Sequence, residues 1–186
     1  MNFVAHYDSE AWTEDSWTQE CDLSELTDTF ADWNDYLLRL FRTSDKYYRW
    51  ALYDRDPLDS WSEGTVTLLG DAVHPMLPYL GQGACMAVED GLVLAGVLGD
   101  RTTDVPTALK HYEALRIPRT REVQLRSRAR AKFNHMTSPW DRFKRDVSLK
   151  VRACFGQDKN VLQGDWIYTY DTDDAMKGND LGVPPS

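Results

Sequence analysis

Three features are scarce in this 186-residue sequence: cysteine, long apolar runs and, near the centre, basic side chains. The cysteines Cys21, Cys85 and Cys154 lie far apart and form no CxxC pair, which argues against a disulfide framework and favours a reducing compartment. No apolar run approaches the roughly 20 residues needed to cross a bilayer, and the N-terminal MNFVAHYDSE has no basic flank followed by an apolar stretch. We therefore expect a cytoplasmic protein of about one domain without a membrane partner.

Common catalytic and nucleotide-binding motifs are also absent. The sequence contains no GxSxG, HExxH or GxxxxGK pattern. Its closest approach to GxGxxG is Gly81-Gln82-Gly83, with Met86 in place of the third glycine. The four histidines do not cluster, so we expect no metal site and assign no catalytic residue.

The net charge of −9 is unevenly distributed along the chain. Residues 1–63 carry a net charge of −10 and residues 101–155 a net charge of +9, while residues 64–100 carry −4 and have no base. The basic block contains Arg116, Arg119, Arg121, Arg126, Arg128, Arg130 and Lys132. Such a block could neutralise nucleic-acid phosphates, but pairing with acids of the same chain or a solvated helix face explains it without a partner. We favour the second explanation and expect no nucleic acid partner.

Hydrophobic spacing predicts the elements of the N-terminal third. A short strand is expected at residues 2–6, followed by an acidic loop with Trp12 and Trp17. Amphipathic helices are expected over Asp22–Phe30 and Trp33–Phe41, and a strand over Tyr47–Tyr53.

The remainder of the chain predicts mainly helices. A strand over Thr65–Leu69 leads through a loop with prolines and glycines into a helix over about Gly83–Leu98. After an N-cap at Asp104, a second helix is expected to end or kink at Pro118, with an arginine-rich helix continuing to about His135. A further helix is expected over Pro139–Phe155, and the tail beyond Gly156 is expected to be loose except for Trp166–Tyr170.

The loop between the predicted strand and the first of these helices has the composition of a ligand site. Asp71 follows a strand, at the sheet edge where α/β folds receive ligands, and its carboxylate can accept hydrogen bonds from vicinal hydroxyls. Gly81 and Gly83 permit close backbone approach, and free N–H groups at a helix start favour an anionic atom. A turn followed by helix-entry glycines explains the same residues equally well, so spacing alone leaves both interpretations open.

Residues 68–95, LLGDAVHPMLPYLGQGACMAVEDGLVLA, closely resemble the second flavin-binding motif of the group A FAD-dependent aromatic hydroxylases. The family pattern Gly-Asp-Ala-x-His-x-x-x-Pro-x-x-Gly-Gln-Gly, continuing to Glu-Asp, is filled at every position, by Gly70, Asp71, Ala72, His74, Pro78, Gly81, Gln82, Gly83, Glu89 and Asp90. The segments Trp50–Pro57 with Trp61, and Tyr112–Arg119, also resemble the salicylate hydroxylase-like branch. The resemblance covers roughly residues 1–135.

The resemblance implies a FAD-binding monooxygenase that uses NAD(P)H and O2 to hydroxylate a small aromatic substrate. It implies that Asp71 binds the ribityl chain of FAD, that Pro78 lies near the reactive edge of the flavin, and that Gly81, Gln82, Gly83 and Ala84 contact its pyrimidine end. Gly70 belongs to the same cofactor-binding set. His74 is part of the motif, with a structural or flavin-adjacent role.

The sequence departs from the family because it has no GxGxxG half. We therefore expect an α/β, or α+β, fragment: the remnant of a three-layer FAD-binding domain with part of the substrate-domain sheet and a helical C-terminal region. The expected division is residues 1–60 in the substrate-domain segment, 61–155 in the FAD-binding part and 156–186 in a loosely ordered tail. A complementary N-terminal half or a homodimer would complete the fold; a non-catalytic interaction module or pseudoenzyme fragment is the alternative.

Two smaller expectations concern side chains near the motif. Cys85 could be redox active, but a small buried thiol that packs the helix is the favoured interpretation. Tyr47, Tyr48, Trp50 and Tyr53 fit an aromatic substrate pocket and an alternation of core and surface aromatics equally well.

Overall fold

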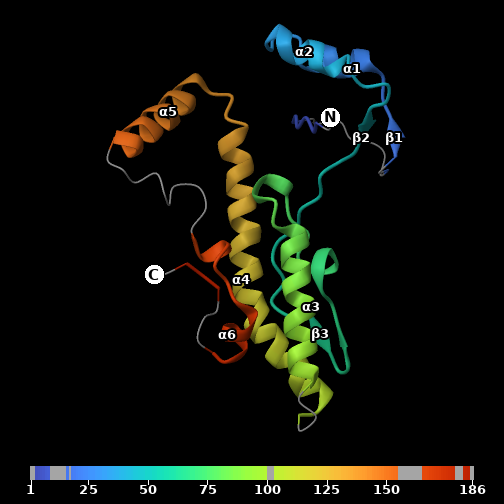
Figure 1. Cartoon of the computed structure of the whole chain (residues 1–186), viewed down its shortest axis with the longest axis vertical. Coiled ribbons are helices and arrows are strands. Elements are labelled where there is room, and N and C mark those ends of the chain that lie inside the picture. The colour runs from blue at the N-terminus through green and yellow to red at the C-terminus, as the bar shows by residue number, and fades with distance from the viewer. Residues whose placement is uncertain are drawn as a thin grey trace. The chain divides into compact units, whose positions relative to one another are not determined.

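The computed structural model describes residues 3–8, 16, 18–99, 103–154, 165–178 and 182–184 (Figure 1). The chain divides into two units, Met1–Leu52 and Tyr53–Ser186. The elements are a mixture of helices and short strands, as expected for an α+β fragment. The domain boundaries at residues 60 and 155 stay predictions.

Two short helices form the centre of the first unit. Helix α1 spans Leu23–Thr29 behind a capping box between Asp22 and Glu25, and helix α2 spans Asp35–Phe41 behind Asn34, whose side chain accepts the Tyr36 N–H at 2.8 Å. Phe30 and Phe41 are buried with their ring centroids 5.7 Å apart. The two predicted helices are thereby confirmed.

The strands of the first unit are shorter than the sequence suggests. Strand β1 (Gln19–Glu20) pairs antiparallel with β2 (Tyr48–Arg49), so the expected strand over Tyr47–Tyr53 forms over only two residues. The prediction of a strand at residues 2–6 is wrong for residues 3–6, where the Phe3 ring packs at 5.2 Å from Phe41 instead of joining a ladder. The acidic loop with Trp12 and Trp17 lies outside the described residues.

The second unit begins with a hairpin that α4 (Val105–Asn134) holds in place. Strands β3 (Ser62–Glu63) and β4 (Val66–Thr67) pair antiparallel, so the expected strand over Thr65–Leu69 is reduced to two residues. Glu113 on α4 accepts the N–H of Trp61 at 2.6 Å and the N–H of Ser62. Burial opposes ionisation of Glu113, but hydrogen bonds from Lys110, Trp61 and Ser62 together hold its pKa below the ordinary value.

Helices α3 (Gly83–Gly99) and α4 lie side by side and enclose the main core (Figure 1). The first hydrophobic cluster contains Trp61, Val73, Val93, Val97, Ala108, Tyr112 and Leu115, and the second contains Leu80, Met86, Val123 and Ile167. Helix α3 was expected over nearly the same residues. Its buried positions recur at three- and four-residue spacing, which places one face against α4.

Helix α4 runs through Pro118 as one 30-residue element, so of the two expected outcomes, an end or a kink at that proline, the end is wrong. A proline inside a helix removes one hydrogen bond and costs about 3 kcal/mol. Arg116 and Arg119 flank Pro118, and both are fully buried in ion pairs with α3. We attribute the continuity of the helix to these contacts, which hold both sides of the proline against α3.

The C-terminal residues that the structure describes are packed against the helix pair. The short helix α6 (Thr172–Met176) contacts α3, and Ile167, Ala175 and Gly182 are buried. The expectation of a loose tail therefore fails for 171–178, while residues 156–164 lie outside the described part. Helix α5 spans Pro139–Cys154, close to the expected range.

Gly182 should tolerate no side chain. Its φ is +62°, and a Cβ would lie 2.5 Å from the Tyr170 ring and 2.6 Å from Arg119 Cδ. We expect Gly182→Ala to lower the free energy of unfolding by about 2–4 kcal/mol, from backbone strain and overpacking together. Gly64→Ala is the matched control, because Gly64 has φ +58° with nothing within 4 Å, and should cost only about 1 kcal/mol. Equal losses in urea denaturation would contradict this account of the packing.

Candidate functional site: the Gly70–Ala84 loop

The loop begins at Gly70, whose position depends on the buried carboxylate of Asp90. Gly70 adopts φ +59° at the start of the 3₁₀ turn η1 (Gly70–Ala72) and donates its N–H to Asp90 Oδ2 at 2.9 Å. An added Cβ would lie 3.2 Å from the Ala87 Cβ on α3. Both the left-handed conformation and the close approach to α3 therefore favour glycine here.

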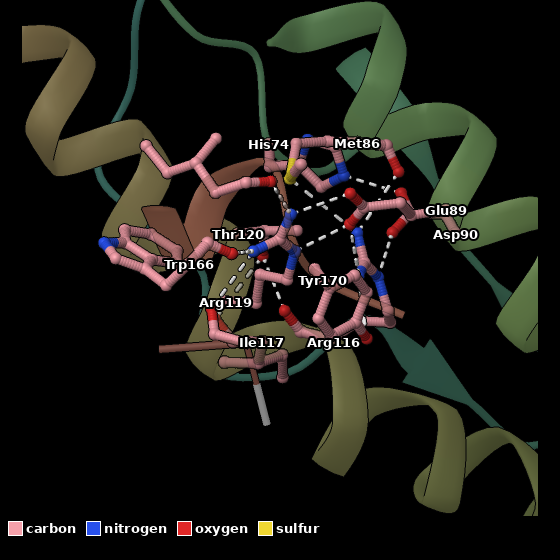
Figure 2. Close-up of polar contacts among 12 residues, drawn as sticks. His74, Met86, Glu89, Asp90, Arg116, Ile117, Arg119, Thr120, Trp166 and Tyr170 are labelled. Atoms are coloured by element: carbon pink, nitrogen blue, oxygen red, sulfur yellow. Dashed lines mark hydrogen bonds and ion pairs between the residues drawn. The ribbon is translucent and has the colours of Figure 1, made fainter. Parts of the chain in front are cut away.

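Asp90 accepts hydrogen bonds from three donors in the interior of the second unit. Besides Gly70, it accepts Nε2 of His74 at 2.6 Å and Nε of Arg116 at 2.8 Å, and all three side chains are almost fully buried (Figure 2). Burial alone would raise the pKa of Asp90, but the His74 hydrogen bond, the Arg116 charge and the Gly70 N–H together hold that pKa below its ordinary value. His74 thus has the structural role that was one of its expected roles.

A second carboxylate, Glu89, joins the two buried arginines of α4. Arg119 donates from Nε and Nη2 to the two Glu89 oxygens at 2.7 and 2.8 Å, and Arg116 pairs with Glu89 at 2.8 Å. Arg119 also donates to the carbonyls of Trp166, Ile167 and Gly182, and its guanidinium lies 3.9 Å from the Tyr170 ring centroid (Figure 2). The motif pair Glu89-Asp90 therefore connects α3, α4 and the C-terminal segment.

Asp71, the next residue after Gly70, is exposed and faces the start of α3. Its Oδ1 lies 4.0 Å from the position that a Cβ on Gly83 would occupy, and Met76 Cγ lies 3.7 Å from the same point. The lack of a side chain at Gly83 thus leaves space beside the carboxylate. The structure brings together Asp71 and Gly83, which are twelve positions apart in the sequence.

The rest of the loop turns into α3 through η2 (Pro78–Leu80). Gly81 follows with φ +64° and open space around it, and Pro78, Gly81 and Ala84 are exposed. Gln82 is buried instead, and its side chain donates to the Leu80 carbonyl at 3.3 Å. The first α-helical bond runs from the Met86 N–H to the Gln82 carbonyl, so the N–H groups of Gly83, Ala84 and Cys85 precede it and have no acceptor within the helix.

Helix α4 also fixes the back of the loop through side chains that the sequence analysis did not single out. Gln124 donates to the carbonyls of Pro75 at 2.8 Å and Arg55 at 2.9 Å, and Ser127 donates to the Leu77 carbonyl. Arg55 in turn donates to the Ala72 carbonyl at 2.6 Å. Only the three-dimensional fold reveals these bonds, because the partners are 17 to 69 positions apart.

The basic block is largely paired within the chain. Besides the two buried arginines, Arg121 pairs with Asp59, Arg126 with Glu122 at 2.6 Å, and Arg128 with Asp54 at 2.6 Å and Asp56 at 2.7 Å. These ion pairs support the interpretation that the positive charges of α4 pair with acidic side chains of the same chain.

Two further expectations have separate outcomes. Cys85 is exposed, so the favoured interpretation as a buried packing thiol is wrong. Tyr47 is half-buried and donates its hydroxyl to the Phe41 and Ser44 carbonyls, whereas Tyr48, Trp50 and Tyr53 are exposed. Since one of the four rings is half-buried and three are exposed, both interpretations of these aromatics stay predictions.

The described residues contain no cluster of three or more side chains suited to a metal ion. Within the same residues, no helix combines the length and apolar character needed to cross a bilayer.

Comparison with known proteins identifies the family of the chain. The model of the FAD binding domain family matches residues 5–127. The chain is 42% identical over 171 residues to 3-amino-4-hydroxybenzoate 2-monooxygenase PtmB3 of Streptomyces platensis, covering 92% of this chain and 42% of that protein. The structure of this chain is similar to that of salicylate hydroxylase in its substrate complex. The TM-score is 0.71 and the identity 30%, and the match covers 95% of this chain and 41% of the other.

A further similar structure contains the cofactor. HpxO of Klebsiella pneumoniae in complex with FAD and uric acid matches with a TM-score of 0.60 and 27% identity, covering 92% of this chain and 39% of that one. The chain belongs to the FAD-binding family of aromatic monooxygenases, and it spans about two fifths of the length of the relatives it matches.

The buried Asp90 should make stability depend on acidity. The pKa of Asp90 in the folded chain lies below the ordinary value of 3.8. Its contribution to the free energy of unfolding is therefore present above about pH 4 and is lost as the pH falls through the folded pKa. We expect Asp90→Asn to lower the free energy of unfolding by about 3–5 kcal/mol near neutral pH, since Arg116 is left buried without this partner. The difference in free energy of unfolding between Asp90→Asn and the native chain should become smaller below pH 4.

Asp56→Asn is the control for the same urea titrations, because Asp56 is 90% exposed in its pair with Arg128. It should cost no more than about 1 kcal/mol. Stability curves of the native chain and Asp90→Asn that stay parallel from pH 7 to pH 3 would rule out the assigned role of this carboxylate.

Proposed function

We propose that this chain forms the flavin-proximal part of a FAD-dependent monooxygenase that hydroxylates a small aromatic substrate with NAD(P)H and O2. The observation that carries the proposal is the placement of the exposed Asp71 carboxylate beside Gly83, where a Cβ would lie 4.0 Å from Asp71 Oδ1, at the first N–H groups of α3. An exposed carboxylate next to a surface without a side chain suits a ligand that has both hydroxyls and a flat ring.

The residues fit FAD in three ways. Asp71 would accept hydrogen bonds from the ribityl hydroxyls, and the N–H groups of Gly83 and Ala84 would face the pyrimidine end of the ring. Pro78 and Gly81 are exposed on the same loop and would line the approach to the ring. Gln82 would contribute through its backbone, because its side chain is buried, while Gly70 would position Asp71 without touching the cofactor.

The cofactor, when bound, supplies the redox chemistry by which electrons from NAD(P)H activate O2. The protein contributes charge stabilisation, since the helix-start N–H groups favour negative charge at the pyrimidine end. These donors are fixed before any ligand arrives, because Gln124 and Ser127 hold the preceding loop to α4. A fixed donor needs no reorganisation as charge develops.

The names of the relatives support a substrate class. PtmB3 is named for 3-amino-4-hydroxybenzoate and the solved structure for salicylate, both benzoate-type rings, so we infer a small aromatic substrate here. A cytoplasmic location, where NAD(P)H is available, is part of the proposal. Most of the relatives' length has no counterpart in this chain, so we assign the activity to this chain together with a complementary polypeptide segment.

A non-catalytic interaction module is the second candidate. The observation in its favour is the exposed apolar side chains of α3 beyond the loop, such as Val88, Leu92 and Leu98. Adding FAD to the purified chain, removing the excess and recording the visible spectrum distinguishes the two. A retained flavin band supports the proposal; a folded, colourless chain that also stays colourless with a complementary segment favours the module.

Asp71 should matter for FAD and little for folding. Loss of its charge-assisted hydrogen bonds, about 1.5–3 kcal/mol, should weaken FAD binding about 10- to 100-fold in Asp71→Ala, measured by titrating flavin fluorescence. Thermal unfolding should be nearly unchanged because the side chain is exposed. Asp59→Ala is the control, an acid that is 91% exposed and pairs with Arg121, and should leave FAD affinity intact. Equal affinity in the Asp71 variant would remove this residue from the site.

A further inference from the structure

Helix α5 (Pro139–Cys154) carries an apolar stripe that is exposed to solvent. The stripe consists of four side chains at three- and four-residue spacing: Trp140, Phe143, Val147 and Val151. Their exposed fractions are 63%, 57%, 41% and 48%. The Trp140 and Phe143 rings stack with their centroids 5.7 Å apart, so the two largest members form one continuous surface. A helix with one polar side ordinarily buries such a stripe against its own fold.

The stripe points away from the side on which α5 contacts α4. Among the described side chains of α5, only Arg145 and Leu149 are half-buried, and all the others are exposed. The Arg145 guanidinium lies 5.8 Å from the centroid of the Phe133 ring on α4. Val147 is two positions from each of the half-buried residues, and two positions turn a helix by roughly 200°. The apolar stripe and the attached side therefore lie on opposite sides of α5.

Basic side chains border the stripe. Residues 139–154 contain five bases and two acids, which gives a net charge of +3. Lys144 follows Trp140 by four positions and Lys150 follows Phe143 by seven, so one exposed lysine lies along each edge of the stripe. The Lys144 Nζ lies 5.3 Å from the centroid of the Trp140 ring. A lysine in such a position can extend its charge toward anionic groups while its methylene chain stays with the apolar layer.

These features decide between the possible occupants of the stripe. A nucleic acid would pair with the bases but would leave the two aromatic rings in water. A second copy of the same face would bring two charges of +3 together, which opposes association. The match to the FAD binding domain family ends at residue 127, before α5 begins, so the shared domain does not account for this helix. An anionic bilayer suits both features, because its headgroups attract lysine and arginine and its interface accepts tryptophan and phenylalanine.

The overall charge of −9 does not oppose this occupant. The acidic excess lies in residues 1–63, which carry −10, whereas residues 101–155 carry +9. At physiological ionic strength, charges separated by more than about 8 Å are largely screened, so the bases of α5 dominate at the surface that α5 contacts. The expectation of no membrane partner rested on the lack of a spanning segment, and a helix that lies in the interface needs none.

We propose that α5 is an interfacial helix that attaches this chain to an anionic phospholipid bilayer. The apolar stripe enters the boundary between headgroups and acyl chains, and Lys144 and Lys150 lie at the phosphates. The negatively charged cytoplasmic leaflet of a cell membrane has this chemistry. The inference goes beyond the proposed function and makes no use of the flavin site, so either can fail without the other.

The test is co-sedimentation of the full chain with vesicles of phosphatidylcholine alone or of phosphatidylcholine and phosphatidylglycerol in equal amounts. The native chain should bind the anionic vesicles at least about tenfold more tightly than the neutral ones, and added salt should weaken this binding. We expect Val147→Glu to weaken it at least about tenfold, because a carboxylate would enter the apolar boundary. Leu125→Glu on α4 is the matched control, since Leu125 and Val147 are both 41% exposed. It should bind within about threefold of the native chain, because its charge lies outside the contact.

The two lysines provide an independent test. Changing Lys144→Gln and Lys150→Gln together should weaken binding to the anionic vesicles about 30-fold, since each basic side chain near the surface contributes about a fivefold factor. The same double change at Lys46 and Lys177, whose side chains are 69% and 66% exposed, is the charge-matched control. Circular dichroism should show native helix content in every variant, because all the changed residues are exposed.

A third measurement locates α5 in the bilayer. Vesicles with brominated acyl chains should quench part of the tryptophan fluorescence of the native chain, and Trp140→Phe should lose that part. No binding to anionic vesicles, equal binding by Val147→Glu and Leu125→Glu, or undiminished quenching in Trp140→Phe would each overturn the proposal. A native dimer that Val147→Glu dissociates would also overturn it, because a second copy would then cover the stripe.

Discussion

The second unit depends on one buried carboxylate. Asp90 is the point at which the glycine that opens the loop, the motif histidine and an arginine of α4 meet, so a single anion determines the position of three separate segments. An uncompensated charge in such a place would cost several kcal/mol, and the three donors are what make its burial tolerable. Asp71 follows Gly70 directly, so the bond between Gly70 and Asp90 also determines where the exposed Asp71 lies.

The two adjacent acids of α3 contact different parts of the second unit. Asp90 faces the loop, while Glu89 faces Arg119 and, through it, the carbonyls of the C-terminal segment. Two neighbouring positions on one helix thus connect the candidate flavin site with residues more than seventy positions later. The pairing explains why a proline in the middle of α4 does not end that helix, since the residues on both sides of it are held to α3.

The sequence predicted most helices and named candidate site residues, but not the bonds around them. Gly70, Asp71 and Gly83 could be found because they fill a family motif, since spacing alone leaves a turn and a ligand site equally open. Gln124, Ser127 and Arg55 could not, because a glutamine or serine on a helix carries no signal for which distant carbonyl it will meet. The strands were overestimated for a related reason. Apolar, β-branched segments indicate strand propensity, but a strand's length depends on a neighbour, and the short partners β1 and β3 pair with only two residues each.

The contacts of Arg119 have a consequence for the order of folding. Its guanidinium is surrounded by Glu89, thirty positions earlier, and by the carbonyl of Gly182, sixty-three positions later. During synthesis the buried cation therefore lacks part of its shell until residue 182 has left the ribosome. Contacts so distant in sequence form slowly, which makes the helix pair vulnerable to premature aggregation until those later residues are added.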